Sequence, residues 1–141
     1  MNAGARFGWL LTDRHSNRFY RGRFEFGFEF DPLFVVRQQG GAAYGFDFYA
    51  FVLKWNFTPH GHIAPYFEFA GGGVITNKDV PPGVSTFNFT PTASAGIRIL
   101  RGKYAWSIGF RWLHISDAGI TYPNPGEDTV GFRIGLNRWL K

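Results

Sequence analysis

A strict alternation of phenylalanine with charged residues or glycine runs through residues 23–31, which read Arg-Phe-Glu-Phe-Gly-Phe-Glu-Phe-Asp. A period of two places all four phenylalanines on one side of an extended strand, because successive side chains of a strand point to opposite faces. On a helix the same residues would be spread around the whole circumference. The pattern therefore predicts a β-strand with one aromatic face and one polar face.

The same alternation recurs along most of the chain. It slips once near Tyr49 and Ala50, as a β-bulge would cause. The run Gly71-Gly72-Gly73 has no following lysine or helix, so we expect it to relieve crowding in a strand rather than to bind phosphate. These 141 residues are expected to form one all-β domain of about seven antiparallel strands without a helix. Besides the strand at residues 23–31, we expect strands at residues 5–12, 44–57, 63–76, 86–100, 104–112 and 129–137.

Composition narrows the class of protein further. Aromatic residues make up 20% of the chain, yet no apolar run approaches the roughly 18 residues that a membrane-spanning helix requires. The abundance of Phe, Tyr and Trp argues against disorder. Cysteine is absent, which excludes disulfides, thiolate zinc sites and cysteine nucleophiles.

The polar faces of the predicted strands carry five basic and five acidic residues, so they are balanced in charge: Arg23, Glu25, Glu29, Asp31, Asp47, Lys54, Glu68, Arg98, Arg111 and Arg133. A soluble barrel would bury the aromatic face and leave these charges in water. A membrane barrel would turn the aromatics toward lipid and pair the charges in its interior. We favour an up-and-down transmembrane β-barrel, since a small soluble barrel has little room for so many aromatic rings. A soluble, lipocalin-like barrel that binds fatty acids is the alternative.

The connections between strands predict how the barrel lies in the membrane. Those at residues 13–17, 58–62 and 101–103 are short, and they alternate with longer ones at 38–43, 77–85 and 117–127. Outer-membrane barrels have short periplasmic turns and longer outer loops, so we expect the C-terminus on the periplasmic side. Several basic residues, Arg14, Arg18, Arg101 and Lys103, then fall on the periplasmic side. The net charge of +5 is therefore poor evidence for binding an outer-leaflet phosphate, and we expect no nucleic-acid partner.

Seven strands is an unusual count, because single-chain bacterial barrels have even numbers. We expect a further strand before Ala5 in the natural precursor. The N-terminus also lacks the apolar region of a secretory signal, which we likewise expect in the precursor.

Polar residues interrupt the aromatic face at one end of two neighbouring strands. His114 and Ser116 continue the apolar row of residues 106–112, and Asp128 begins the apolar row of residues 130–136. If these two strands form a hairpin, Asp128 lies near His114 and Ser116 on the same face. Glu127 points to the other side.

A serine, a histidine and a carboxylate together suit acyl transfer, in which the carboxylate orients the imidazole and the imidazole takes the serine proton. Side chains two residues apart on a straight strand are roughly 7 Å apart. The strand must therefore bend or end between His114 and Ser116. Asp117-Ala118-Gly119 follows, and a turn there would offer backbone N–H groups to an oxyanion. Otherwise, the three polar residues are ordinary side chains of a membrane interface.

The segment His114-Ile115-Ser116-Asp117-Ala118-Gly119, followed by Pro123-Asn124-Pro125-Gly126, resembles the C-terminal signature of PagL-type lipid A 3-O-deacylases, a family also labelled acyloxyacyl hydrolases. The similarity covers nearly the whole chain and lacks only the family's first strand. Supporting pieces lie upstream, in residues 21–27, 54–57, 64–66 and 87–91.

The resemblance implies an eight-stranded barrel of the bacterial outer membrane that hydrolyses the 3-O-linked 3-hydroxyacyl ester of lipid A. It implies Ser116 as nucleophile, His114 as general base, Asp128 as acid and the Gly119 N–H as oxyanion donor, with no metal or cofactor. The family pattern has Asn at the position of Asp117 and Glu at the position of Asp128. Both departures bear on activity, and Glu127 is the fallback acid.

The expected partners are lipid A within lipopolysaccharide and the surrounding outer-membrane lipids, and a homodimer is left open.

A rival to the esterase is a catalytically silent structural barrel. His60 and His62 lie in a turn without a third ligand, which favours solvated residues over a metal site.

Overall fold

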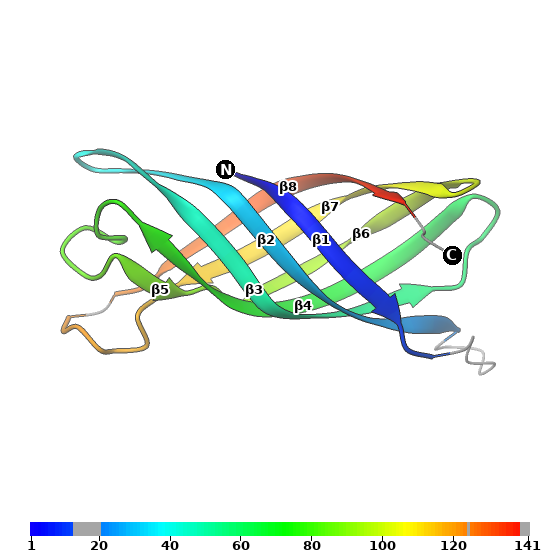
Figure 1. Cartoon of the computed structure of the whole chain (residues 1–141), viewed down its shortest axis with the longest axis horizontal. Coiled ribbons are helices and arrows are strands. Elements are labelled where there is room, and N and C mark those ends of the chain that lie inside the picture. The colour runs from blue at the N-terminus through cyan, green and yellow to red at the C-terminus, as the bar shows by residue number, and fades with distance from the viewer. Residues whose placement is uncertain (13–20, 124, 139–141) are drawn as a thin grey trace.

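The computed structural model describes residues 1–12, 21–123 and 125–138, and it consists of β-strands joined by turns and loops (Figure 1). Within these ranges, no helix is long and apolar enough to cross a membrane. The strands are β1 (Asn2–Leu10), β2 (Gly22–Gln38), β3 (Gly41–Phe57), β4 (Ile63–Thr76), β5 (Phe87–Phe89), β6 (Thr92–Arg101), β7 (Tyr104–Ile115) and β8 (Glu127–Arg138).

All neighbouring strands are antiparallel, in the order β1-β2-β3-β4-β6-β7-β8, with the short β5 paired to β4. The predicted all-β antiparallel architecture is confirmed. β5 and β6 together correspond to the single strand expected at residues 86–100. Pro91 has no N–H to donate, and the strand is interrupted there. The pairing with β7 continues across the gap, because Thr92 pairs with Leu113 and Phe89 pairs with Ser116 in one register.

The sheet curls into an open, barrel-like half-shell. In Figure 1, β2 and β3 cross in front of β7 and β8, with the interior between them. Ion pairs span this interior: Arg133 of β8 lies 2.6 Å from Glu29 of β2 and 3.1 Å from Glu68 of β4. Such contacts between strands that are not neighbours require the sheet to be strongly curved around its interior. Among the described residues, β1 and β8 form no ladder with each other and remain the two edges.

Two β-bulges reset which residues face inward. The bulge between Tyr49 and Phe51 in β3 confirms the predicted slip. The second, between Asp31 and Phe34 in β2, was not expected. It turns Phe34 inward, and β2 ends at Gln38, where the sequence placed the start of the connection to the next strand.

Two predicted boundaries differ from the structure. The first strand spans Asn2–Leu10 rather than residues 5–12. The expected long connection at residues 38–43 is a two-residue turn, because β2 and β3 pair up to Gln38 and Gly41. The predicted turn at residues 13–17 lies outside the described residues.

The interior is polar and the outer face is aromatic. Glu29 and Glu68 are almost fully buried at its centre, in contact with Arg6, Lys54, Arg111 and Arg133. The rings that point outward are exposed, among them Phe28, Phe30, Phe46, Phe48, Phe67, Phe69, Trp106, Phe110, Trp112 and Phe132. This is the inverted arrangement of faces that the sequence favoured.

An apolar cluster fills one end of the interior. It consists of Phe34, Ala43, Val74, Val80 and Ile115, all buried. We call this end the loop end, because it carries the loops of residues 77–86 and 116–126; the opposite end, with the turns at residues 58–62 and 102–103, is the turn end. Val80 comes from the 77–86 loop, so that loop folds over the strand ends. Ile115, the last residue of β7, anchors the strand in the cluster.

Candidate active site

The β7–β8 hairpin brings His114 and Asp128 together on the outer face at the loop end. The two residues are direct cross-strand partners, as the alternation predicts. His114 Nδ1 lies 2.9 Å from Asp128 Oδ1, and both side chains reach the surface, being 31% and 63% exposed. Although aspartate is one methylene shorter than glutamate, it spans the gap because the strands set the two residues directly opposite each other.

The surroundings of His114 orient its ring. With Asp128 accepting a hydrogen bond from Nδ1–H, the tautomer that leaves Nε2 as an acceptor is favoured. Trp112 stacks on the imidazole, with ring centroids 6.1 Å apart and planes inclined by 25°. Gly126, which belongs to the signature segment but had no predicted role, lies against the edge of the ring that carries Nε2. The histidine is thus held on three sides.

Ser116 lies just beyond the end of β7. The β7–β8 ladder ends at Ile115, so pairing with β8 stops one residue before Ser116. Phe89 holds the main chain of Ser116 on the other side: the Ser116 N–H donates to Phe89 O at 3.2 Å, and the Phe89 N–H donates to Ser116 O at 2.7 Å. Within the described part of the chain, Ser116 Oγ makes no hydrogen bond to His114.

Asp117 points inward and is only 1% exposed. Its Oδ1 accepts a hydrogen bond from the Gly119 N–H at 3.0 Å, and its Oδ2 accepts one from the Thr121 N–H at 2.7 Å. Burial acts to raise the pKa of Asp117, but hydrogen bonds from Thr121 and Gly119 outweigh it and hold this pKa below its usual range. The Gly119 N–H, expected to serve an oxyanion, is therefore engaged by Asp117 here.

Residues 117–120 form a tight turn directly after Ser116. Ala118 and Gly119 have φ angles of 58° and 81°, and the Ile120 N–H donates to Asp117 O at 3.3 Å. Positive φ at both central residues is the mark of a type I′ turn. Ala118 adopts a left-handed conformation that costs a non-glycine residue roughly 1–2 kcal/mol. The alternation of apolar residues carries no signal for this turn.

The remaining candidate residues lie elsewhere. Glu127 pairs with the buried Ile115, so it lies on the face opposite to Asp128. His60 and His62 are exposed in the turn at residues 58–62. Among the described residues, no cluster of three or more His, Cys, Asp or Glu side chains is grouped to hold a metal ion.

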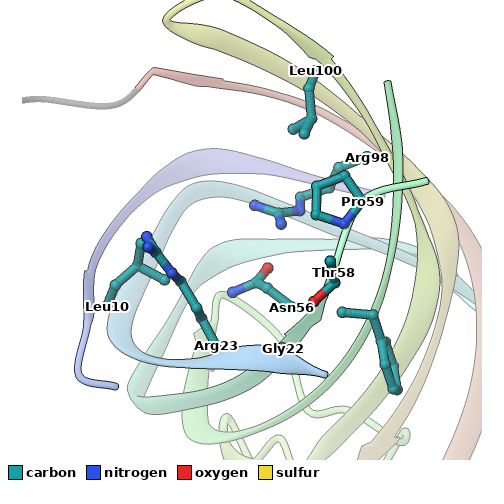
Figure 2. A pocket seen from close by; sticks show the side chains of 9 residues that line it. Leu10, Gly22, Arg23, Asn56, Thr58, Pro59, Arg98 and Leu100 are labelled. Atoms are coloured by element: carbon teal, nitrogen blue, oxygen red, sulfur yellow. The ribbon is translucent and has the colours of Figure 1, made fainter. Parts of the chain in front are cut away.

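A cavity of about 250 Å³ opens at the turn end of the barrel (Figure 2). Figure 2 shows the side chains of Arg23 and Arg98 approaching it from two strands, with Asn56 nearby. None of the predicted catalytic residues lines this cavity. It lies at the opposite end of the barrel from His114, so it is separate from the candidate site.

Comparisons with known proteins bear on the family and on the fold. A family model described as lipid A 3-O-deacylase (PagL) matches residues 2–137. The chain is also similar to a solved structure, "Crystal structure of the outer membrane enzyme PagL", with 20% sequence identity and a TM-score of 0.62 over 93% of this chain and 85% of that one. At this identity the likeness shows the fold. A search of curated proteins finds no match.

Proposed function

This chain belongs to the lipid A 3-O-deacylase (PagL) family, and we propose that it hydrolyses the 3-O-linked 3-hydroxyacyl ester of lipid A with Ser116, His114 and Asp128. Membership of the family makes it an outer-membrane ester hydrolase. The observation that carries the finer proposal is the contact of 2.9 Å between His114 Nδ1 and Asp128 Oδ1, on the aromatic outer face and beside Ser116.

In the proposed reaction, Asp128 keeps the proton on Nδ1 of His114, which leaves Nε2 to accept the proton of Ser116 Oγ. The serine oxygen then attacks the ester carbonyl, and His114 returns the proton to the departing sugar oxygen. Water then attacks the acyl-serine with His114 again as base, and His114 returns this proton to Ser116 Oγ as the 3-hydroxy fatty acid leaves. The Ser116–His114 hydrogen bond forms on substrate binding, since such contacts are often absent without substrate.

The oxyanion requires backbone donors near Ser116. The N–H of Gly119 is engaged by Asp117, and that of Ser116 itself donates to Phe89. Among the described residues, no acceptor is found for the N–H groups of Asp117 and Ala118. The N–H of the residue after a nucleophile is a common oxyanion donor. We therefore assign this role to Asp117 and Ala118 in place of Gly119.

The location of the site suits a substrate that remains in the membrane. His114 continues a row of exposed rings that includes Trp106, Phe110 and Trp112. With this row in the acyl-chain region and the loop end facing out of the cell, the polar residues lie at the depth where acyl chains join the sugar. Lipid A then reaches Ser116 sideways from the outer leaflet, without entering the barrel.

The test is mass spectrometry of lipid A incubated with the folded protein in detergent. Wild type should remove one 3-hydroxyacyl chain, and both Ser116→Ala and His114→Asn should abolish this loss. Ser107→Ala, which changes an inward-facing serine of the same strand, should remain active. Deacylation by Ser116→Ala at the wild-type rate would exclude the mechanism.

A silent structural barrel is the rival, because Ser116 Oγ is not bonded to His114 in this structure. The structural-barrel hypothesis would be favoured if the wild-type protein folds but never removes an acyl chain from lipid A. Folding is checked independently by the faster migration of unheated barrel on a denaturing gel.

A further inference from the structure

The carboxylate of Asp117 is the most fully hydrogen-bonded group next to the proposed nucleophile. It is buried, whereas the neighbouring Ser116 is partly exposed and Ala118 is exposed. Its two oxygens accept separate backbone hydrogen bonds, at 3.0 Å from Gly119 and at 2.7 Å from Thr121. The side chain of Asp117 thereby links three residues of one short segment: Asp117, Gly119 and Thr121.

The two hydrogen bonds to the Asp117 side chain stabilise a turn whose residue types are unfavourable for its conformation. Asparagine or glycine is the usual first central residue of a type I′ turn, but here it is Ala118 at a φ of 58°. The main-chain hydrogen bond that closes the turn, from Ile120 to Asp117, is long at 3.3 Å. The two shorter bonds to the Asp117 side chain must therefore hold much of the conformation.

The turn also lies where the main chain stops being supported from both sides. Toward the N-terminus, β7 is fixed by both β6 and β8, and Phe89 holds Ser116 from one side. From Ser116 onward the partner strand β8 is absent, since its ladder ends at Ile115. Any rotation of the 117–121 segment is then transmitted directly to Ser116 and to the N–H groups that follow it.

We propose that Asp117 is a positioning residue: its side chain ties the N–H groups of Gly119 and Thr121 into the turn that fixes Ser116 and its neighbouring oxyanion donors. The importance of this turn for catalysis rests on the function proposed above. The role differs from that of an oxyanion donor, because an ionised carboxylate has no proton to donate. It explains how a negative charge is accommodated beside the nucleophile, since both oxygens are directed into the turn.

Two substitutions separate this role from others. Asp117→Ala removes both acceptors, whereas Asp117→Asn keeps one acceptor and places an N–H₂ group opposite one of the two backbone donors. Asp79→Asn is the matched control, because Asp79 is an exposed acid in the neighbouring loop of residues 77–86. Each variant is refolded in detergent, and its folding is checked by the gel-mobility shift.

The first readout is amide hydrogen exchange at Gly119 and Thr121, measured by NMR. We expect Asp117→Ala to speed exchange at both amides at least tenfold, Asp117→Asn to speed it at one of them, and Asp79→Asn to leave both unchanged. This readout requires no activity. Unchanged exchange in Asp117→Ala would overturn the proposal.

The second readout is the kinetics of deacylation. We expect Asp117→Ala to lower kcat at least tenfold with KM changed less than threefold, and Asp117→Asn to fall between it and wild type. Faster exchange with an unchanged kcat would also overturn the positioning role. If the wild type itself does not deacylate lipid A, the proposed function fails, and the exchange measurement alone decides whether Asp117 holds the turn.

Discussion

Gly126 lies so close to His114 that a methyl group on its Cα would be 2.9 Å from Cε1 of the imidazole and 3.3 Å from Nε2. This is the Cε1–Nε2 edge of the ring, and Cε1 is bonded to the Nδ1 atom that contacts Asp128. Gly126 also has a φ angle of 62°, which side chains disfavour. Its position therefore combines a steric and a conformational requirement for glycine.

We predict that Gly126→Ala lowers kcat/KM for lipid A deacylation at least tenfold. The added methyl group must push the imidazole away from its place between Trp112 and Asp128, in addition to a backbone cost of roughly 1–2 kcal/mol. Steady-state kinetics of the refolded barrel measure the effect. The matched control is Gly83→Ala, since Gly83 has a φ of 80° but nothing within 4 Å of the new methyl group. Equal losses in both variants would show that the contact with His114 is unimportant.

Substitutions of the adjacent residues Asp128 and Glu127 test which of the two is the catalytic acid. Asp128→Asn should lower kcat by about 10²-fold or more, because the amide no longer stabilises the imidazolium that forms during the reaction. Glu127→Gln should change kcat less than threefold, since Glu127 pairs with Ile115 on the other face. If Glu127→Gln instead has the larger effect, Glu127 is the acid and the 2.9 Å contact is incidental.

The His114–Asp128 pair was predictable because the alternation of faces along each strand and the register of the hairpin together place the two residues opposite each other. Once two strands with alternating faces are joined by one loop, the residues that share a face and a depth follow from counting. The large-scale arrangement of charged interior and aromatic exterior followed in the same way. No knowledge of side-chain contacts was needed for either prediction.

A turn at Asp117-Ala118-Gly119 was considered from the sequence, but its conformation was not predictable by counting. Its conformation depends on hydrogen bonds from one side chain to two backbone groups, and on a left-handed alanine that sequence preferences disfavour. The bulge between Asp31 and Phe34 in β2 was missed for a related reason, because alternation alone does not show where one extra residue resets the two faces. Arg6 was overlooked because its segment alternates weakly, although it contacts both Glu29 and Glu68.

Glu68 should be essential for the stability of the barrel. It is 1% exposed and contacts Arg6, Lys54, Arg111 and Arg133. Removing one partner of a buried ion pair costs about 3–5 kcal/mol, because the remaining charges lose their compensation. We therefore expect Glu68→Gln to lower the free energy of unfolding by about this amount, measured by urea titration of the refolded barrel. A change as small as that of the exposed control Asp79→Asn would contradict the inferred role of the cluster.

Gly72 should tolerate no side chain. A Cβ at this position would overlap with Phe48 O and lie 2.6 Å from Tyr49 Cα, because the β3 backbone approaches closely beside its bulge. Gly72→Ala must move backbone rather than a flexible side chain, so we expect a loss of at least about 1–3 kcal/mol or a failure to fold. The control is Gly131→Ala in β8, where nothing lies within 4 Å. Comparable unfolding curves for the two variants would contradict this account.

The turn after Ser116 should be stable to acid until the carboxyl group of Asp117 is protonated. Its pKa is lower in the folded turn than its ordinary value of 3.8, with burial opposing this shift and hydrogen bonds from Thr121 and Gly119 producing it. A group with a lowered folded pKa stabilises the fold fully above its unfolded pKa and loses this effect as the pH falls through the folded value. The amide NMR signals of Gly119 and Thr121 should therefore stay constant from neutral pH to about 4 and shift only below it. In Asp117→Ala this acid transition should disappear. A transition of the wild-type signals above pH 4 would mean that another group controls the turn.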